Sequence, residues 1–249
     1  MIACTTLHEL LSMKMWDEAM IRIRSHPAEV AKIWSCSTLT DDIQRRVNAY
    51  PLHNACYLNA PYHLIMALID SFPRAIKIPD TGYNRLPIHH AILGKGDPKV
   101  VDNLLDRHPE SSAWQDGLGR VPLHYALFCQ ASSFIIEKMI GINSKVIQVQ
   151  DRNGWTPLHL AGAVSVPPHV VRALVFACPD VLQKIDAQGF CPRDFFIIHD
   201  TVGMDVIEFL VEITPKDILM AEDILPIYEM LLNRSLTNAN HELQPNKSV

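Results

Sequence analysis

The sequence predicts an all-α protein that is built from stacked helical hairpins joined by tight turns. Three observations carry this prediction: a recurring Pro-Leu-His phrase, turn-forming residues ahead of it, and aliphatic pairs at helical spacing after it. The phrase occurs at Pro51-Leu52-His53, Pro87-Ile88-His89, Pro122-Leu123-His124, Pro157-Leu158-His159 and, in degraded form, Pro192-Arg193-Asp194. Its prolines are separated by 36, 35, 35 and 35 residues. A fixed period of this length is typical of stacked units whose hydrophobic core runs lengthwise.

The residues ahead of each phrase favour a tight turn. An aspartate lies six residues before the proline and a glycine three residues before it: Asp116 and Gly119, Asp151 and Gly154, Asp186 and Gly189. Aspartate can accept hydrogen bonds from the backbone that follows it, and glycine accepts a positive φ. Asn48 and Asn84 occupy the glycine position in the earlier copies, and we expect them to adopt the same conformation.

A pair of helices is expected after each turn. The motif proline suits the first helical turn, where its missing N–H costs no hydrogen bond. The first helices are expected from His53 to about Asn59, His89 to about Leu93, His124 to about Cys129 and His159 to about Ala163. The second helices carry the pairs Leu68-Ile69, Leu104-Leu105, Met139-Ile140, Leu174-Val175 and Phe209-Leu210, and we expect them to end at Pro73, Pro109, Pro179 and Pro215.

This pattern predicts one repeat domain over residues 1–234 and a disordered tail over 235–249. The expected units are about 1–34, 45–79, 80–115, 116–150, 151–185 and 186–222, followed by a closing helix at 223–234. In the first unit Leu7-His8 stands in the motif position, with helices expected at Leu7–Ser12 and Trp16–Arg24. The 45-residue step from His8 to His53 indicates an insertion within Ser35–Arg46.

These residues resemble the ankyrin repeat family, whose pattern is a β-turn, then Thr-Pro-Leu-His-x-Ala, then two antiparallel helices. The copy from Asp151 to Ala161 matches every signature position, and the resemblance covers about residues 5–215 as six units. It implies an ankyrin-repeat solenoid of helix-turn-helix units joined by β-turn loops. Two features depart from the family: the period is 35 rather than about 33, and Arg193-Asp194 replaces Leu-His, which indicates a capping variant.

Composition argues against several classes of function. A net charge of −5 does not favour nucleic-acid binding. That charge is uneven, because residues 200–249 hold nine acidic and three basic groups, so their −6 leaves about +1 for the rest. The six cysteines show no paired spacing, no secretory signal is recognisable, and no run reaches the ~20 apolar residues of a membrane span. We therefore expect an intracellular protein, cytoplasmic or nuclear, without a membrane span.

The four motif histidines are the tempting candidates for a metal site. They are His53, His89, His124 and His159. Zinc needs ligands within ~2 Å of one point, whereas stacked helices lie about 10 Å apart, and the resemblance implies that this histidine binds turn backbone instead. Gly94-Lys95-Gly96-Asp97 lacks the full phosphate-loop signature, and we recognise no nucleophile and base pair. We expect no metal, no cofactor and no enzymatic activity.

The resemblance implies that a partner binds at variable positions on the turn tips and on the inner face of the first helices. The position two residues before the motif proline holds Arg85, Arg120, Trp155 and Phe190, which we name the turn ladder. Nearby helix positions add Tyr57, His90, Tyr125 and Phe128. Tyrosine, tryptophan and arginine are enriched at binding hot spots. We expect a monomeric, non-catalytic module that binds a protein or peptide on its concave face.

Other interpretations of the same residues remain open at this stage. Trp155 and Phe190 could serve only to pack adjacent turns together. The chain could be a structural fragment of a larger scaffold with no ligand of its own, or a regulatory subunit associated with an enzyme. The acidic final segment has a simple explanation as a solvated cap, which a repeat array needs at its ends, and a sharper one as a surface for self-association with Arg85 and Arg120.

Overall fold

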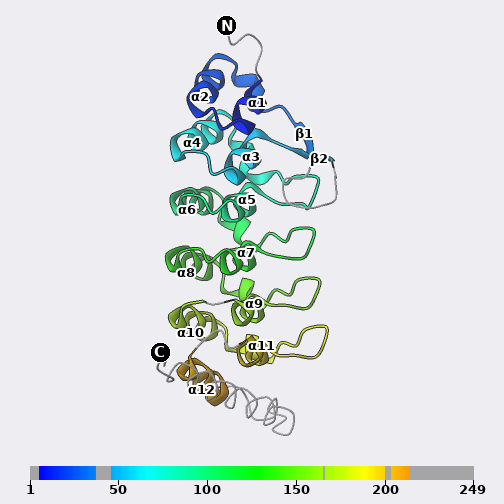
Figure 1. The fold of residues 1–249 in the computed structure, drawn as a ribbon, viewed down its shortest axis with the longest axis vertical. Coiled ribbons are helices and arrows are strands. Elements are labelled where there is room, and N and C mark those ends of the chain that lie inside the picture. The colour runs from blue at the N-terminus through cyan, green and yellow to red at the C-terminus, as the bar shows by residue number, and fades with distance from the viewer. Residues whose placement is uncertain (1–5, 38–45, 165, 200–202, 214–249) are drawn as a thin grey trace, which may run out of the picture.

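The computed structural model describes residues 6–37, 46–164, 166–199 and 203–213, which are mostly helical. Figure 1 shows two parallel columns of helices that are stacked along the long axis, with loops projecting from the side of the inner column. The inner column contains α1 (Leu7–Ser12), α3 (Pro51–Tyr57), α5 (Pro87–Leu93), α7 (Pro122–Phe128), α9 (Pro157–Ala163) and α11 (Pro192–His199). The outer column contains α2 (Trp16–Ser25), α4 (Tyr62–Ser71), α6 (Pro98–Arg107), α8 (Ser133–Ile142), α10 (Pro168–Ala177) and α12 (Met204–Ile213).

The helix positions confirm the predicted pairs, with small shifts at their ends. Each later inner helix begins at the motif proline rather than at the histidine, since proline is preorganised for the first helical position. The predicted first pair is observed at Leu7–Ser12 and Trp16–Ser25. None of the described helices is long and apolar enough to cross a membrane.

The prolines that follow the outer helices begin short 3-10 turns. These turns lie at Pro73–Lys77, Pro109–Ala113 and Pro179–Gln183, and an equivalent turn without a proline lies at Ser144–Gln148. The residue before each proline leaves the helical region, as at Phe72 with φ −144°, because the proline ring clashes with a helical predecessor. The 3-10 turns thus fill the segment between the outer helix and the next turn. Pro215 lies outside the described residues.

The predicted insertion holds a short hairpin that the periodicity did not reveal. Strands β1 (Trp34–Ser37) and β2 (Arg46–Ala49) pair antiparallel, with Ser35 opposite Asn48. The expectation that Asn48 takes the glycine-like conformation is wrong, because strand pairing holds its backbone extended. Asn84 does adopt a positive φ of 56°, and the turn glycines have φ of 78°, 80° and 91° at Gly119, Gly154 and Gly189.

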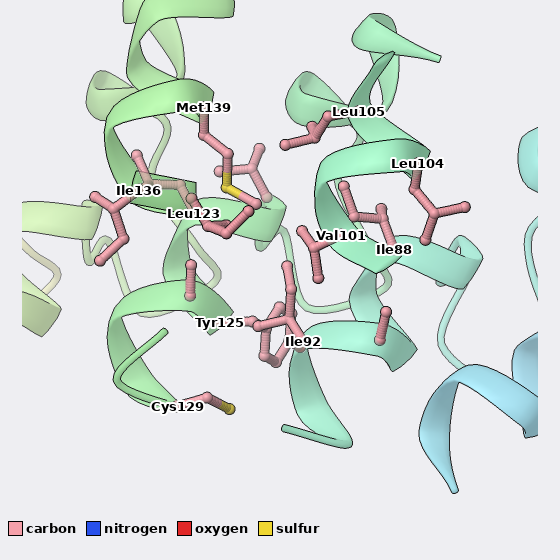
Figure 2. Close-up of a cluster of buried hydrophobic side chains, with 14 of the residues drawn as sticks. Ile88, Ile92, Val101, Leu104, Leu105, Leu123, Tyr125, Cys129, Ile136 and Met139 are labelled. Carbon is pink, nitrogen blue, oxygen red and sulfur yellow. The ribbon is translucent and has the colours of Figure 1, made fainter. Parts of the chain in front are cut away.

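The core lies between the two columns and runs through the stack. Figure 2 shows one section of it, where side chains of α5 and α6 meet those of α7 and α8. Leu104, Leu123 and Met139 are at most 1% exposed there, and full burial of such a side chain contributes about 2 kcal/mol. Small residues let the inner helices approach closely: Ala55, Ala91, Ala126 and Ala161 are buried. The predicted closing helix at 223–234 and tail at 235–249 lie outside the described residues.

Candidate functional site

The motif histidines bind backbone, as the sequence predicted. In four copies, at His53, His89, His124 and His159, the histidine Nδ1 accepts the N–H of the residue three positions earlier, for example Val121 N to His124 Nδ1 at 3.2 Å. His124 Nε2 then donates to the carbonyl of Trp155 at 3.0 Å, and His159 Nε2 donates to that of Phe190 at 3.1 Å. Each of these two bonds joins an inner helix to the turn of the next unit.

Burial keeps these histidines neutral. Desolvation lowers the pKa of His53 to about 3 and that of His89 to about 4, and it lowers the pKa of His124 and His159 as well. A neutral ring offers one acceptor and one donor, which matches the two backbone bonds that the motif makes. His89 is the exception, because its Nε2 has no partner among the described residues.

The turn aspartates hold each loop together from inside. Asp116 Oδ1 accepts the N–H groups of Leu118 at 2.8 Å and Arg120 at 3.0 Å. Asp151 and Asp186 repeat this arrangement with the residues two and four positions later. One oxygen of each carboxylate is therefore committed to its own turn, and the other oxygen remains for a neighbouring unit.

Three residues of the turn ladder donate hydrogen bonds to this second carboxylate oxygen. Arg85 Nε donates to Asp116 Oδ2 at 3.1 Å, and Arg120 Nε donates to Asp151 Oδ2 at 3.0 Å. Trp155 Nε1 donates to Asp186 Oδ2 at 3.2 Å. Each donor lies 31 residues before its aspartate, so the bonds link successive turns. Phe190, the last member of the ladder, has no donor and is 37% exposed.

A buried polar cluster surrounds the first rung of the ladder. Tyr125 Oη donates to Asp116 Oδ2 at 2.5 Å and accepts from Arg85 Nη2 at 2.9 Å. The Arg85 guanidinium also lies 4.5 Å from the ring centre of Tyr83. The side chain of Arg85 is 8% exposed and that of Asp116 is 0% exposed. Burial opposes ionisation of Asp116, but hydrogen bonds from Tyr125 and the backbone prevail and lower its pKa.

His90, which the sequence analysis named as a partner-binding residue on an inner helix, also makes a bond inside the protein. Its Nε2 lies 2.7 Å from Asp80 Oδ2, and its side chain is 14% exposed. In the later units a ladder donor lies 31 residues before the aspartate. Ala49 takes this position before Asp80, so Asp80 has no ladder donor. A residue of the same unit therefore provides the bond that a ladder residue provides elsewhere. Arg85, Tyr125 and His90 are thus placed to stabilise the stack rather than to offer exposed anchors.

A partly exposed line of apolar side chains runs along the ends of three stacked inner helices. Tyr57, Leu93 and Phe128 are the last residues of α3, α5 and α7, each six positions after the motif proline. We name these three residues the inner-helix strip. Phe128 is 60% exposed, and Tyr57 and Leu93 are half-buried. Tyr57 and Phe128 were predicted from the sequence, whereas Leu93 was missed although it occupies the same position in the period.

A small cavity lies beside the strip, between the loops that follow α5 and α7. Its volume is about 160 Å³, and Ile92, Lys95, Cys129, Gln130 and Ile135 are among the residues that line it. Lys95 and Gln130 hold positive φ values of 52° and 54°, which turn the chain sharply from inner to outer helix. Apolar residues thus line this cavity together with the exposed Lys95.

Comparison with known proteins does not assign this chain to a family. No protein-family model matches the chain, and a search of curated proteins finds no significant match. In the part of the chain that the structure describes, no group of three or more histidine, cysteine, aspartate or glutamate side chains is placed to hold a metal ion.

Proposed function

We propose that this chain is a non-catalytic interaction module, an ankyrin-repeat solenoid in architecture, which binds a protein or peptide partner along its inner helices. The motif copies, their 35-residue period and the helix pairs support the architecture. The histidine and aspartate bonds between successive units support it further. Stacks of this kind present extended surfaces, which suit extended partners.

The inner-helix strip is the observation that carries the binding proposal. Phe128 exposes most of an aromatic ring, and it does so in line with Tyr57 and Leu93 on neighbouring helices. Single exposed apolar residues are ordinary, and larger apolar patches mark interaction sites; we take Phe128 as the exposed centre of such a patch, with the half-buried Tyr57 and Leu93 beside it. The proposed contact is therefore apolar at its centre, with Lys95 at its edge to pair with an acidic group of the partner.

The turn ladder has a smaller part in this proposal than its residue types suggest. Arg120 and Phe190 keep exposed area, with the Arg120 side chain 29% and the Phe190 residue 37% exposed, so both are proposed to lie at the rim. The internal bonds of Arg85 and Trp155 favour the alternative, in which the turns serve architecture alone and the chain is a structural part of a larger scaffold.

We further propose that the protein acts as a monomer inside the cell, in the cytoplasm or nucleus. The described thiols Cys56, Cys129, Cys178 and Cys191 are buried and form no disulfide with one another. Burial raises the pKa of Cys191 to about 11, so this thiol stays protonated and unreactive. Reduced, buried cysteines suit a compartment that keeps thiols reduced.

A matched pair of phenylalanines tests the binding proposal. Phe128 on the strip and Phe134 on α8 are each 60% exposed, so alanine at either removes the same ring from water. Partners would be captured from a lysate with the wild-type chain and identified by mass spectrometry, and affinities would then be measured with purified partner. Phe128→Ala should weaken binding about tenfold or more, and Phe134→Ala should leave it unchanged. Equal affinity of both variants would remove the strip from the site.

A further inference from the structure

The cavity between the helix pairs α5–α6 and α7–α8 has apolar walls of fixed shape. Ile92 of α5, Val101 of α6 and Ile135 of α8 line it and are at most 5% exposed. Figure 2 shows Ile92 and Val101 between the two helix pairs. The cavity volume is about 160 Å³, and an apolar protein cavity of about 150 Å³ stays dry and binds benzene. The space therefore suits one aliphatic side chain better than it suits water.

Two glycines in the loop after α5 explain why the protein leaves this space open. Gly94 and Gly96 stand where the next unit has Cys129 and Ala131, seven and nine residues after the motif proline. A Cβ at either glycine would collide with the preceding unit, and at Gly96 it would lie 2.8 Å from Asn59 Oδ1. The glycines thus let the loop lie close to the preceding unit. Gly96 also lines the cavity and contributes no side chain to fill it.

The edge of the cavity carries a positive charge. Among the described residues that line the cavity, the exposed Lys95 is the one with a charged side chain. Burial raises the pKa of the Cys129 thiol in the cavity wall, and the nearby charge of Lys95 opposes this shift. Asp97 follows two residues later, and its Oδ1 accepts the N–H of Lys99 at 2.9 Å as the cap of α6. A carboxylate beside an apolar side chain therefore complements both the cavity and its edge.

We propose that the partner of the inner-helix strip is an acidic peptide segment that inserts one leucine-sized side chain into this cavity and places a neighbouring carboxylate beside Lys95. The inference rests on the proposed function and names the chemistry of the partner. Phe128, the last residue of α7, directly precedes the cavity-lining Cys129. A peptide anchored in the cavity can therefore continue over the exposed Phe128 ring. Side chains that fill a desolvated pocket carry much of the affinity at such interfaces.

Methyl NMR spectroscopy of the full-length chain tests the anchor, with three capped tripeptides as probes. The tripeptide acetyl-Asp-Leu-Asp-amide should bind with millimolar affinity and shift the methyl signals of Ile92, Val101 and Ile135. The probe acetyl-Asp-Ala-Asp-amide lacks the larger aliphatic group and should bind about tenfold more weakly or less. The probe acetyl-Asn-Leu-Asn-amide lacks the carboxylates and should bind about threefold more weakly, since an exposed ion pair contributes little.

Two variants connect probe binding to the cavity. Ala131→Leu fills the cavity from its own wall and should weaken binding of the leucine probes about tenfold. Lys95→Asn removes the charge with a residue that tolerates the positive φ of 52°, and it should abolish the preference for Asp-Leu-Asp over Asn-Leu-Asn. Lys14→Asn is the matched control, because Lys14 is exposed and has a φ of 57° in the equivalent loop of the first unit.

The outcomes separate this inference from the proposed function. Equal affinity for the leucine and alanine probes, or methyl shifts away from the three wall residues, would overturn the cavity as an anchor, even where Phe128→Ala weakens binding of a captured partner. Leucine-selective binding in the cavity supports the anchor, and a neutral Phe128→Ala would then remove only the strip. The probes and Lys95→Asn decide the question even where Ala131→Leu fails to fold.

Discussion

The turn ladder and the inner-helix strip both recur with the period of the array, but the structure uses them in opposite ways. Arg85, Arg120 and Trp155 direct their N–H groups to aspartates of the next turn. Phe128 offers no polar group, and its ring is largely in solvent. The comparison teaches that a residue type favoured at binding sites is informative only after its internal bonds are known. Polar ladder residues bind their neighbours, whereas Phe128 of the strip is largely exposed, which is why we propose the strip and not the ladder as the centre of a partner surface.

Acidification is expected to give the largest effect, and it should act through the motif histidines that bond the turns and not through the strip. Because the folded pKa of His53 and His89 lies below the unfolded value of 6.5, the unfolded chain binds more protons between pH 6.5 and their folded values of about 3 and 4. Their stabilisation is full above pH 6.5 and falls as the pH drops, by roughly 1 kcal/mol per histidine per pH unit. The strip residues Tyr57, Leu93 and Phe128 do not titrate there.

Urea denaturation at pH 7.0 and 5.0 measures this effect. The free energy of unfolding should fall markedly between the two values, before the aspartates begin to protonate. A His124→Gln variant, which removes one titrating ring, should show a shallower fall than the wild type. Stability that is equal at both pH values would contradict neutral, buried motif histidines.

Removing ladder arginines should give the next largest effect, graded by burial. Arg85→Ala leaves Asp116 buried and without its cation, which should cost about 3 kcal/mol. Arg120 is 29% exposed, so Arg120→Ala should cost only about 1 kcal/mol. Urea denaturation of both variants at neutral pH gives the two free energies of unfolding. Equal losses would contradict the prediction that the more buried ion pair contributes more to stability.

The smallest effects are expected at Trp155 and Phe190, the last two members of the ladder. Trp155→Phe keeps most of the ring, but it removes the Nε1–H that Asp186 accepts at 3.2 Å. The expected cost is about 1 kcal/mol, the value of a single hydrogen bond. Phe190→Ala removes an exposed side chain that donates no such bond, and it should alter stability less still. A larger loss at Phe190 would mean that the ladder acts by packing alone.

Much of the fold followed from the period in the sequence. The prolines, turn residues and aliphatic pairs placed the helices of each unit within a few residues. The hairpin of β1 and β2 could not be predicted in this way, because it lies in an insertion that has no counterpart elsewhere in the array. Asn48 shows the consequence, since its register matched the turn position while strand pairing decided its conformation.

The sequence spacing could have predicted that the ladder residues bond inside the protein, although their residue types alone could not. Each ladder donor is followed at the same spacing by an aspartate, as Arg85 is by Asp116, whereas Ala221 takes the corresponding position after Phe190. Every ladder donor therefore has an aspartate at this spacing, although the aspartate Asp80 has Ala49 in place of a donor, and only a comparison between units reveals this. Leu93 was missed for a different reason: a leucine at a helix end is typical of the core, and Leu93 does pack partly against the core in the structure.

A double-mutant cycle between Arg85 and Asp116 tests most directly whether the ladder works inside the stack. The free energy of unfolding would be measured for the wild type, Arg85→Ala, Asp116→Asn and the double variant. A direct bond between a buried cation and carboxylate predicts a coupling of about 2 kcal/mol, so the double variant should be much less destabilised than the sum. Additive effects, with coupling below about 0.5 kcal/mol, would contradict an internal ladder and return Arg85 to the candidates for partner binding.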